Sequence, residues 1–250
     1  MKKILVVSDN SALTAFFQEL IKTEILQTPV SVDFTYSSSN SNPVELVALG
    51  AGPVDLKNPT IIDAVINKYN LIFSLHCKQI FPARIVNEIE CVNLHPGLNP
   101  YNRGWYPQVF SIINKKPIGA TLHFMDEQVD HGPIIAQEEV EVNEWDTSLD
   151  VYRKVIEAEK LILQSNFSCI LNGQAIAHES KLEGNYNSIS DFRDICKLDI
   201  GEVATLKQHI DLLRALTHGD FLNAYYIDEE GNKIFIKIEM TKVEQPKVTH

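Results

Sequence analysis

The stretch LIFSLHCKQIFPARIVNEIECVNLH, residues 71–95, decides the fold. It begins with the apolar run Leu71–Leu75, continues through a helical pattern from Pro82 to Ile89, and ends in a second apolar run that starts at Cys91. An apolar strand, a helix and another apolar strand in close succession are typical of a parallel sheet that is buried on both faces. The stretch therefore predicts an α/β fold.

The residues that precede this stretch repeat the same alternation. Strands are predicted at Lys3–Val7 and Val30–Tyr36, and helices at Ala12–Lys22 and Thr60–Tyr69, with the polar loop Ser37–Pro43 among them. We therefore expect a Rossmann-like, mostly parallel, doubly wound sheet. Ligands bind such sheets outside the carboxyl ends of the strands.

Two more strand-like runs follow, at Ile118–Met125 and Pro133–Val142. The sequence Thr147-Ser148-Leu149-Asp150 then resembles a capping box that opens a long helix, which is expected to end before Gly173. The residues of this helix that are expected to face the core are Leu149, Tyr152, Val155, Ile156 and Leu161.

The last part of the chain predicts a small helical and hairpin region. A helix is expected at Glu202–Thr217, and the runs Ala224–Ile227 and Lys233–Met240 are expected to pair as a hairpin. We accordingly divide the chain into a main domain, residues 1–180, and a carboxyl-terminal extension with a helix and a hairpin, residues 181–250. No structure is assigned to Gln245–His250.

Composition excludes several classes of protein. The 250 residues carry a net charge of −11, which disfavours binding to a nucleic acid backbone. The four cysteines show no CxxC spacing, so buried free thiols in a reducing compartment are expected. No apolar run approaches the roughly 20 residues that span a bilayer, and the amino terminus lacks a cleavage site. A cytoplasmic protein without a membrane partner is expected.

Three polar side chains stand at predicted strand ends or turns. Asn93 and His95 follow the apolar pair Cys91-Val92, and Asp130 lies in the turn between two strands. An acyl transfer to an amine needs a donor for the developing oxyanion, a base for the leaving proton and a carboxylate that supports the base. Asn93, His95 and Asp130 fit these roles if the sheet brings them together.

Each of these residues also has a purely structural interpretation. Asn93 and Asp130 are compatible with turn capping, and His95 with an ordinary loop histidine before Pro96. Competing motifs are largely missing: Gly50-Ala51-Gly52-Pro53 lacks the third glycine of a dinucleotide-binding loop, and no GxSxG or Walker sequence occurs.

Taken together, four motifs resemble the 10-formyltetrahydrofolate-dependent formyltransferases. They are Asn93-Leu94-His95-Pro96-Gly97-Leu98-Asn99-Pro100, Tyr101-Asn102-Arg103-Gly104 with Pro107, Gly119-Ala120-Thr121-Leu122-His123, and Asp130-His131-Gly132-Pro133-Ile134-Ile135. The resemblance implies a folate donor, with Asn93 and His95 polarising the formyl group and Asp130 assisting proton transfer. Either His95 or Asp130 remains a candidate for the group that takes the amine proton.

Within this family, the chain is most similar to bacterial sugar N-formyltransferases that act on dTDP-linked amino-dideoxy sugars. The similarity lies in Ser74–Pro82, in Tyr101–Pro107 and in the hairpin around Tyr225. The first strand is followed by Ser8-Asp9-Asn10-Ser11 and not by a glycine-rich phosphate loop, and the acidic carboxyl terminus disfavours tRNA. The resemblance implies dTDP-4-amino-4,6-dideoxyglucose as acceptor, a role in surface polysaccharide (lipopolysaccharide O-antigen) synthesis, and a homodimer.

The resemblance and the side-chain chemistry together give two sets of candidate binding residues. The expected folate-binding residues are Gln79, Ile80, Phe81, Pro82, Met125, Asp126 and Val129. The expected residues for the sugar nucleotide are Asn10, Lys78, Arg103, Trp105 and Tyr106, with Lys78 near the pyrophosphate and the two aromatic faces near the base or sugar.

Three other hypotheses stay open from sequence. A hydrolase of the same folate would keep Asn93, His95 and Asp130, and a binding module without chemistry would keep the pocket. A metal site formed by His76, Cys77, His95 or His131 is a remote alternative, so no metal is expected. The sequence does not determine whether the sugar amine is at C3 or C4, the sugar configuration or the nucleotide.

Overall fold

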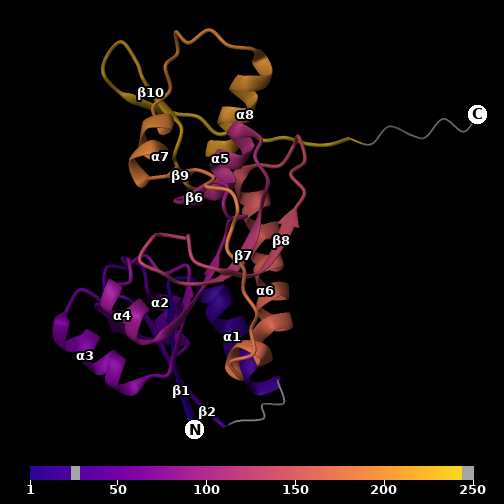
Figure 1. The fold of residues 1–250 in the computed structure, drawn as a ribbon. Helices are drawn as coiled ribbons and strands as arrows, with labels where there is room; N and C mark the ends of the chain where they lie inside the picture. Colours follow the sequence, from indigo (N-terminus) through magenta and orange to yellow (C-terminus); the bar gives the residue numbers. More distant parts are fainter. Residues whose placement is uncertain (24–28, 244–250) are drawn as a thin grey trace, which may run out of the picture.

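A computed structural model describes residues 1–23 and 29–243. Its centre is a seven-stranded sheet with the strand order β3-β2-β1-β4-β5-β7-β8 (Figure 1). The strands from β3 to β5 are parallel, whereas β7 and β8 are antiparallel to their neighbours. The strands are β1 (Lys2–Ser8), β2 (Val30–Ser37), β3 (Gly52–Val54), β4 (Leu71–Leu75), β5 (Glu90–His95), β7 (Ile118–Phe124) and β8 (Ile134–Val140).

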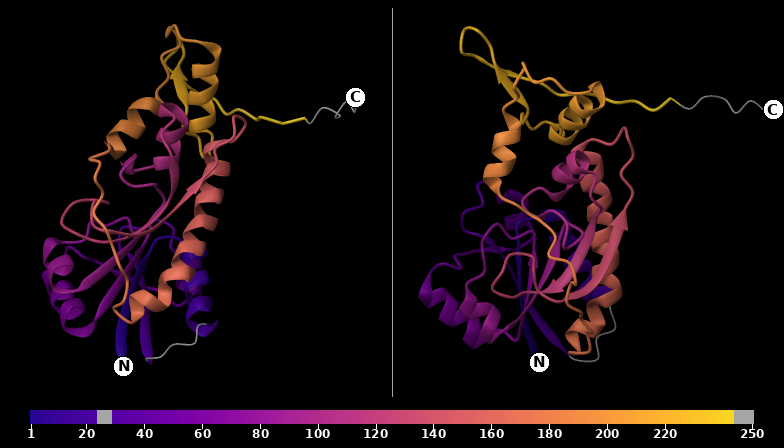
Figure 2. Two further views of the ribbon diagram at one scale, coloured as in Figure 1. Left: turned by 45° about the vertical axis from the view of Figure 1, so that its right-hand side comes forward. Right: turned by 45° about the horizontal axis from the view of Figure 1, so that its top comes forward.

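Helices cover both faces of this sheet, which confirms the doubly wound α/β fold (Figures 1 and 2). The helices are α1 (Ser11–Thr23), α2 (Val44–Ala48), α3 (Pro59–Lys68), α4 (Ala83–Glu88), α5 (Pro107–Asn114), α6 (Ser148–Leu171), α7 (Ile189–Cys196) and α8 (Leu206–Leu216). The short strands are β6 (Arg103–Gly104), β9 (Tyr186–Asn187), β10 (Tyr225–Ile227) and β11 (Lys233–Phe235).

The two cores of the sheet follow from the alternation of side chains along its strands. In β1, Ile4 and Val6 join a core with α1 and α6, while Leu5 and Val7 join a core with α3 and α4. Successive residues of a strand point to opposite faces, so a continuous apolar run is the pattern that a strand buried on both faces requires. The run at residues 71–75 is buried in the same way.

The carboxyl-terminal elements form a third core with α5 and the first turns of α6. Val109 and Ile112 of α5 pack with Val151 and Val155 of α6, and with Ala215 of α8. Figure 2 shows α7, α8 and the hairpin at the end of the molecule remote from the amino terminus. These elements therefore lie on the side to which the carboxyl ends of the parallel strands point.

Several element boundaries differ from the sequence-based expectation. The helix expected at Glu202–Thr217 begins only at Leu206, because Thr205 and Gln208 form a capping box there. The second hairpin strand ends at Phe235 and not at Met240. Leu161, expected in the core, is 59% exposed, because it lies one helical position before the buried pair Ile162-Leu163. Gln245–His250 lie outside the described residues.

The structure confirms the predicted start of the long helix. Thr147 is the N-cap of α6 and forms a capping box with Asp150, as the sequence predicts. The helix ends just before Gly173, which adopts a φ of 66°. Within residues 1–23 and 29–243, no helix is both long enough and apolar enough to cross a membrane.

Candidate active site

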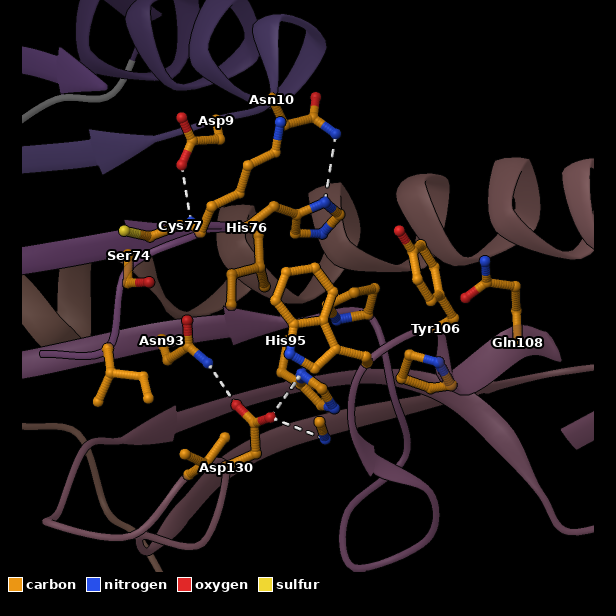
Figure 3. A pocket seen from close by; sticks show the side chains of 18 of the residues that line it. Asp9, Asn10, Ser74, His76, Cys77, Asn93, His95, Tyr106, Gln108 and Asp130 are labelled. Atoms are coloured by element: carbon orange, nitrogen blue, oxygen red, sulfur yellow. Dashed lines mark hydrogen bonds and ion pairs between the residues drawn. The ribbon is translucent and has the colours of Figure 1, made fainter. Parts of the chain in front are cut away.

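A cavity of about 640 Å³ opens at the carboxyl ends of β1, β4 and β5. Its volume lies in the range of about 300–1,000 Å³ that is common for small-molecule sites. Figure 3 shows Asn93, His95 and Asp130 on one side of this pocket, with Asn10 and His76 across from them. The sheet thus brings together the three side chains that the sequence singles out.

Asp130 is the centre of this group. Its Oδ1 accepts a hydrogen bond of 3.0 Å from Asn93 Nδ2, and its Oδ2 accepts one of 3.1 Å from the Gly104 amide. Oδ2 also lies 3.4 Å from His95 Nδ1. Burial raises the pKa of Asp130, but the interactions with His95, His123 and the Gly104 amide outweigh it and lower the pKa to about 2. Asp130 is therefore a fixed anion at neutral pH.

His95 is buried, and its two nitrogens differ. Nδ1 faces Asp130, whereas Nε2 has no hydrogen-bond partner among the described residues. Burial lowers the pKa of His95 to about 4, although Asp130 opposes this shift. A neutral imidazole whose Nδ1–H points at the carboxylate leaves a free lone pair on Nε2. The site therefore contains an available basic nitrogen.

Two glycines make room for this arrangement. A Cβ at Gly97 would contact His95 Nε2, so a larger residue there displaces the imidazole. Gly104 has a φ of 90°, which lets its amide point at Asp130. Strand β6, which contains Gly104, pairs with β9, so residues 186–187 support the loop from behind.

His123 is a site residue to which the sequence assigns no role. Because β5 and β7 pair antiparallel, His123 lies directly opposite Asn93. His123 Nδ1 lies 2.7 Å from the Phe124 carbonyl and donates to it, so Nε2 accepts the Asn93 amide at 3.2 Å. Both amide hydrogens of Asn93 are thus engaged, one with Asp130 and one with His123.

Most of the expected folate-binding residues line the pocket. Gln79, Ile80, Phe81, Met125, Asp126 and Val129 do so, whereas Pro82 is not among the lining residues. The Gln79 side chain is held by the backbone of β3 and the following turn, since it donates to the Val54 carbonyl and accepts from the Leu56 amide. Asp126 lies 2.9 Å from His131 Nδ1.

The residues expected to bind the sugar nucleotide fall into two groups, those that line the pocket and one that does not. Lys78, Trp105 and Tyr106 line the pocket. Asn10 also lines it, but its amide is occupied by Tyr152, His76 and Leu13. Arg103 instead lines a separate cavity of about 120 Å³ on the far side of Asp130, 3.6 Å from Glu183.

Several residues that line the pocket are not indicated by any sequence pattern described above. The Phe192 ring lies against the Tyr106 ring, with centroids 4.1 Å apart and planes tilted by 41°, and the Phe221 ring centroid lies 5.8 Å from that of His218. Both aromatic groups come from the carboxyl-terminal elements, which become part of the pocket only through tertiary packing. His76, Tyr106 and Asp130 have φ values of 54°, 51° and 51°, a strained conformation that concentrates at functional sites.

The metal hypothesis receives no support from side-chain placement. In the part of the chain that the structure describes, no three His, Cys, Asp or Glu residues are arranged to hold a metal ion. The four cysteines are free thiols as expected, but Cys169 is exposed and Cys77 only partly buried, so the expectation that all are buried holds for Cys91 and Cys196. Burial raises the pKa of Cys77, which lines the pocket, to about 11.

Comparison with known families matches nearly the whole chain. A formyl transferase family model matches residues 6–166. A model described as the N-formyltransferase dimerization C-terminal domain matches residues 191–242.

Individual relatives agree with these matches. A dTDP-4-amino-4,6-dideoxyglucose formyltransferase of Mycobacterium tuberculosis H37Rv is 45% identical over 174 residues, which are 70% of this chain and 74% of the relative. The structure of a sugar N-formyltransferase from Shewanella has a TM-score of 0.95 at 46% identity and covers 98% of this chain and 100% of its own. A 4-N formyltransferase from Francisella tularensis has a TM-score of 0.90 at 47% identity, with 97% and 99% coverage.

Proposed function

Because the chain belongs to the formyl transferase family, we propose that it is a sugar N-formyltransferase that moves a formyl group from 10-formyltetrahydrofolate to the amine of dTDP-4-amino-4,6-dideoxyglucose. The observation that carries the proposal is the group formed by a buried anion, a neutral imidazole with a free nitrogen and an amide, all at one end of a large pocket. The acceptor is chosen because a relative that is 45% identical bears that name.

His95 Nε2 is the proposed base. As the amine nitrogen bonds to the formyl carbon, one N–H bond of the amine breaks, and Nε2, the free lone pair beside the reaction, accepts the proton. The bond between the formyl carbon and N10 of the folate then breaks, and the imidazolium returns the proton to N10, so that tetrahydrofolate leaves. Asp130 holds the imidazole through Nδ1 and stabilises the imidazolium that forms. A role for Asp130 as the direct proton acceptor is disfavoured, because a carboxyl with a pKa of about 2 holds a proton poorly.

Asn93 is the proposed donor to the developing oxyanion. Its two amide hydrogens are directed at Asp130 and His123, so it can serve the oxyanion only if one of these contacts is released. The contact with His123 is the longer one, at 3.2 Å against 3.0 Å, and its acceptor is an imidazole nitrogen and not a carboxylate oxygen. We therefore propose that the His123 contact gives way as negative charge develops on the oxygen.

The lining of the pocket offers suitable chemistry to both substrates. Ile80, Phe81, Met125 and Val129 provide an apolar wall that fits a flat pterin, and 10-formyltetrahydrofolate bound there would supply the formyl group. Lys78 offers a cation for a pyrophosphate. The adjoining rings of Tyr106 and Phe192 offer an aromatic surface to a nucleobase.

His95 is expected to stay neutral well below the usual histidine range. Its pKa is lowered from 6.5 to about 4, so protonation sets in only as the pH falls far below 6.5. An unfolded chain binds this proton near pH 6.5, so His95 reduces the free energy of unfolding as the pH drops from 6.5 towards 4. NMR titration of the imidazole signal, assigned by its loss in His95→Gln, should show little change between pH 8 and 5.5. A midpoint near 6.5 would contradict the burial argument.

The hydrolase alternative differs from the transferase in that it needs no amine acceptor. We expect consumption of 10-formyltetrahydrofolate to depend on an added amino sugar, because the transferase needs an amine to attack the formyl carbon. The measurement is the absorbance of the folate product with and without dTDP-4-amino-4,6-dideoxyglucose. Equal rates in both reactions would assign hydrolysis to the same three residues and remove the transferase proposal.

The carboxyl-terminal elements are proposed to form a homodimer, with residues 1–180 as the catalytic domain. The proposal is supported by the match of residues 191–242 to a dimerization domain. It is also supported by apolar side chains that are exposed on these elements, namely Ile200, Val203, Leu206 and Leu222. Light scattering at micromolar concentration should give twice the mass of the chain, and a monomer would remove this part of the proposal.

A further inference from the structure

A second buried carboxylate lies beside the pocket and takes no part in the chemistry proposed above. Glu159, on α6, is 0% exposed, and its two oxygens lie 2.7 and 2.9 Å from His76 Nε2. Burial raises its pKa, and a buried carboxylate without a partner is strongly unfavourable. His76 Nε2 therefore carries a hydrogen and donates it to Glu159.

The remaining hydrogen bonds of this cluster follow from that one. With hydrogen on Nε2, the neutral His76 ring accepts at Nδ1, 3.3 Å from Asn10 Nδ2. The second hydrogen of Asn10 Nδ2 goes to the Tyr152 hydroxyl oxygen at 2.9 Å, and Asn10 Oδ1 accepts from the Leu13 amide. Asn10 is saturated, so its own amide has no hydrogen left for a ligand.

Within this cluster, the Tyr152 hydroxyl keeps a hydrogen that it can donate to a ligand. Its oxygen accepts from Asn10, and its own hydrogen has only a long contact of 3.4 Å with His76 Nδ1. A hydroxyl that is fixed as an acceptor on one side presents its hydrogen in a defined direction. Both Tyr152 and His76 line the pocket (Figure 3 shows His76 beside Asn10).

The cluster belongs to the wall of the pocket that also contains Lys78, the residue proposed above for the pyrophosphate. His76 and Lys78 follow β4, the strand beside the one that carries His95, and His76 is close enough to His95 to influence its pKa. On the other side, the Tyr152 ring lies 5.5 Å from His218 of the carboxyl-terminal region. Tyr152 thus lies between the end of β4 and the wall to which the carboxyl-terminal elements contribute.

We propose that the Tyr152 hydroxyl donates a hydrogen bond to an oxygen of the diphosphate-linked amino sugar, and that Glu159, through His76 and Asn10, holds this hydroxyl in position. The inference rests on the proposed function. Tyr152 is then a residue that determines specificity for the acceptor, and Glu159 and His76 are positioning residues. The acceptor oxygen belongs either to the sugar or to the pyrophosphate, two sources with the same hydrogen-bonding chemistry.

The first test is Tyr152→Phe, assayed with both substrates. We expect KM for the amino-sugar nucleotide to rise about three- to tenfold, the range for loss of one hydrogen bond from a neutral donor, while KM for the folate and kcat stay within about twofold. Tyr36→Phe, which removes a hydroxyl on β2 outside the pocket, is the matched control. Inhibition by dTDP alone locates the oxygen: weaker inhibition of Tyr152→Phe assigns it to the pyrophosphate, and equal inhibition assigns it to the sugar.

The second test concerns Glu159. Glu159→Gln keeps the size of the side chain, and we expect it to raise KM for the sugar nucleotide without changing KM for the folate. In Tyr152→Phe/Glu159→Gln, the loss should not exceed that of Tyr152→Phe alone, because Glu159 acts through the hydroxyl. Circular dichroism melting curves separate this effect from a loss of folded protein.

Two results would overturn the inference. One is an unchanged KM for the sugar nucleotide in folded Tyr152→Phe, and the other is full additivity of the two substitutions. A wild-type enzyme that formylates no amino-sugar nucleotide is a separate outcome, since it removes the proposed function itself.

Discussion

Replacing His95 by glutamine is expected to lower kcat/KM for formyl transfer by about 10²- to 10⁴-fold, the usual contribution of a positioned general base. Glutamine retains a polar side chain but has no basic nitrogen in place of Nε2, which is free in the structure. Steady-state assays with both substrates measure the effect. The substitution introduces no new charge, so the thermal midpoint should fall by only a few degrees.

A matched control for this substitution is His178→Gln. His178 is exposed and contacts Ile134 through its backbone, so its side chain has no role in the pocket. Near-wild-type turnover in His95→Gln, with His178→Gln also active, would contradict the assignment of His95 as the base.

Replacing Asp130 by asparagine is expected to cost a similar factor, about 10²- to 10⁴-fold in kcat. Both carboxylate oxygens accept hydrogen bonds, from Asn93 and from the Gly104 amide. An asparagine offers one oxygen and one NH₂ group, so one of these donors would face another donor. The negative charge that stabilises the imidazolium is lost at the same time.

The change of the His95 pKa in the Asp130 variant distinguishes the loss of the anion from misfolding of the protein. Because Asp130 raises the pKa of His95, Asp130→Asn should lower that pKa further, which an NMR titration below pH 5 can follow. Asp33→Asn, which removes a half-exposed partner of Lys68, is the control for loss of a surface carboxylate and should leave turnover unchanged. Turnover of Asp130→Asn within threefold of the wild type would refute the role of the anion.

The sequence predicts those parts of the fold that local patterns determine. The apolar runs of β1, β4 and β5 need two buried faces, so their alternation with helices is sufficient to indicate a doubly wound sheet. The motif residues Asn93 and His95, at the end of β5, then fall on the ligand-binding edge. This geometry is why Asn93 and His95 can be singled out from the sequence, whereas Asp130, in the turn between β7 and β8, is indicated by its own motif.

The details that the sequence does not reveal depend on tertiary contacts. His123 faces Asn93 only because β7 runs antiparallel to β5 in one register, which no local pattern specifies. Arg103 faces the cavity behind Asp130 and not the pocket that its neighbour Gly104 lines, because successive residues of the short strand β6 point to opposite sides. Asn10 is polar and stands at a strand end, but its hydrogens are taken by residues far along the chain.

One missing helix and one misplaced helix start, by contrast, had signals in the sequence. Ser188 and Asp191 form a capping box at the start of α7, a helix absent from the predicted elements, and Thr205 and Gln208 form another at the start of α8. Each pair has the spacing that correctly marks α6 at Thr147 and Asp150. Capping signals therefore locate helix starts here better than apolar periodicity does.

The most direct test of the proposed activity is the mass of the sugar product. The purified protein is incubated with 10-formyltetrahydrofolate and either dTDP-4-amino-4,6-dideoxyglucose or its 3-amino isomer, and each nucleotide sugar is analysed by mass spectrometry. We predict that the 4-amino sugar gains one formyl group, and that it reacts faster than the 3-amino sugar. Recovery of both sugars unchanged, with folate consumed or not, would contradict the assignment of this chain as a sugar N-formyltransferase.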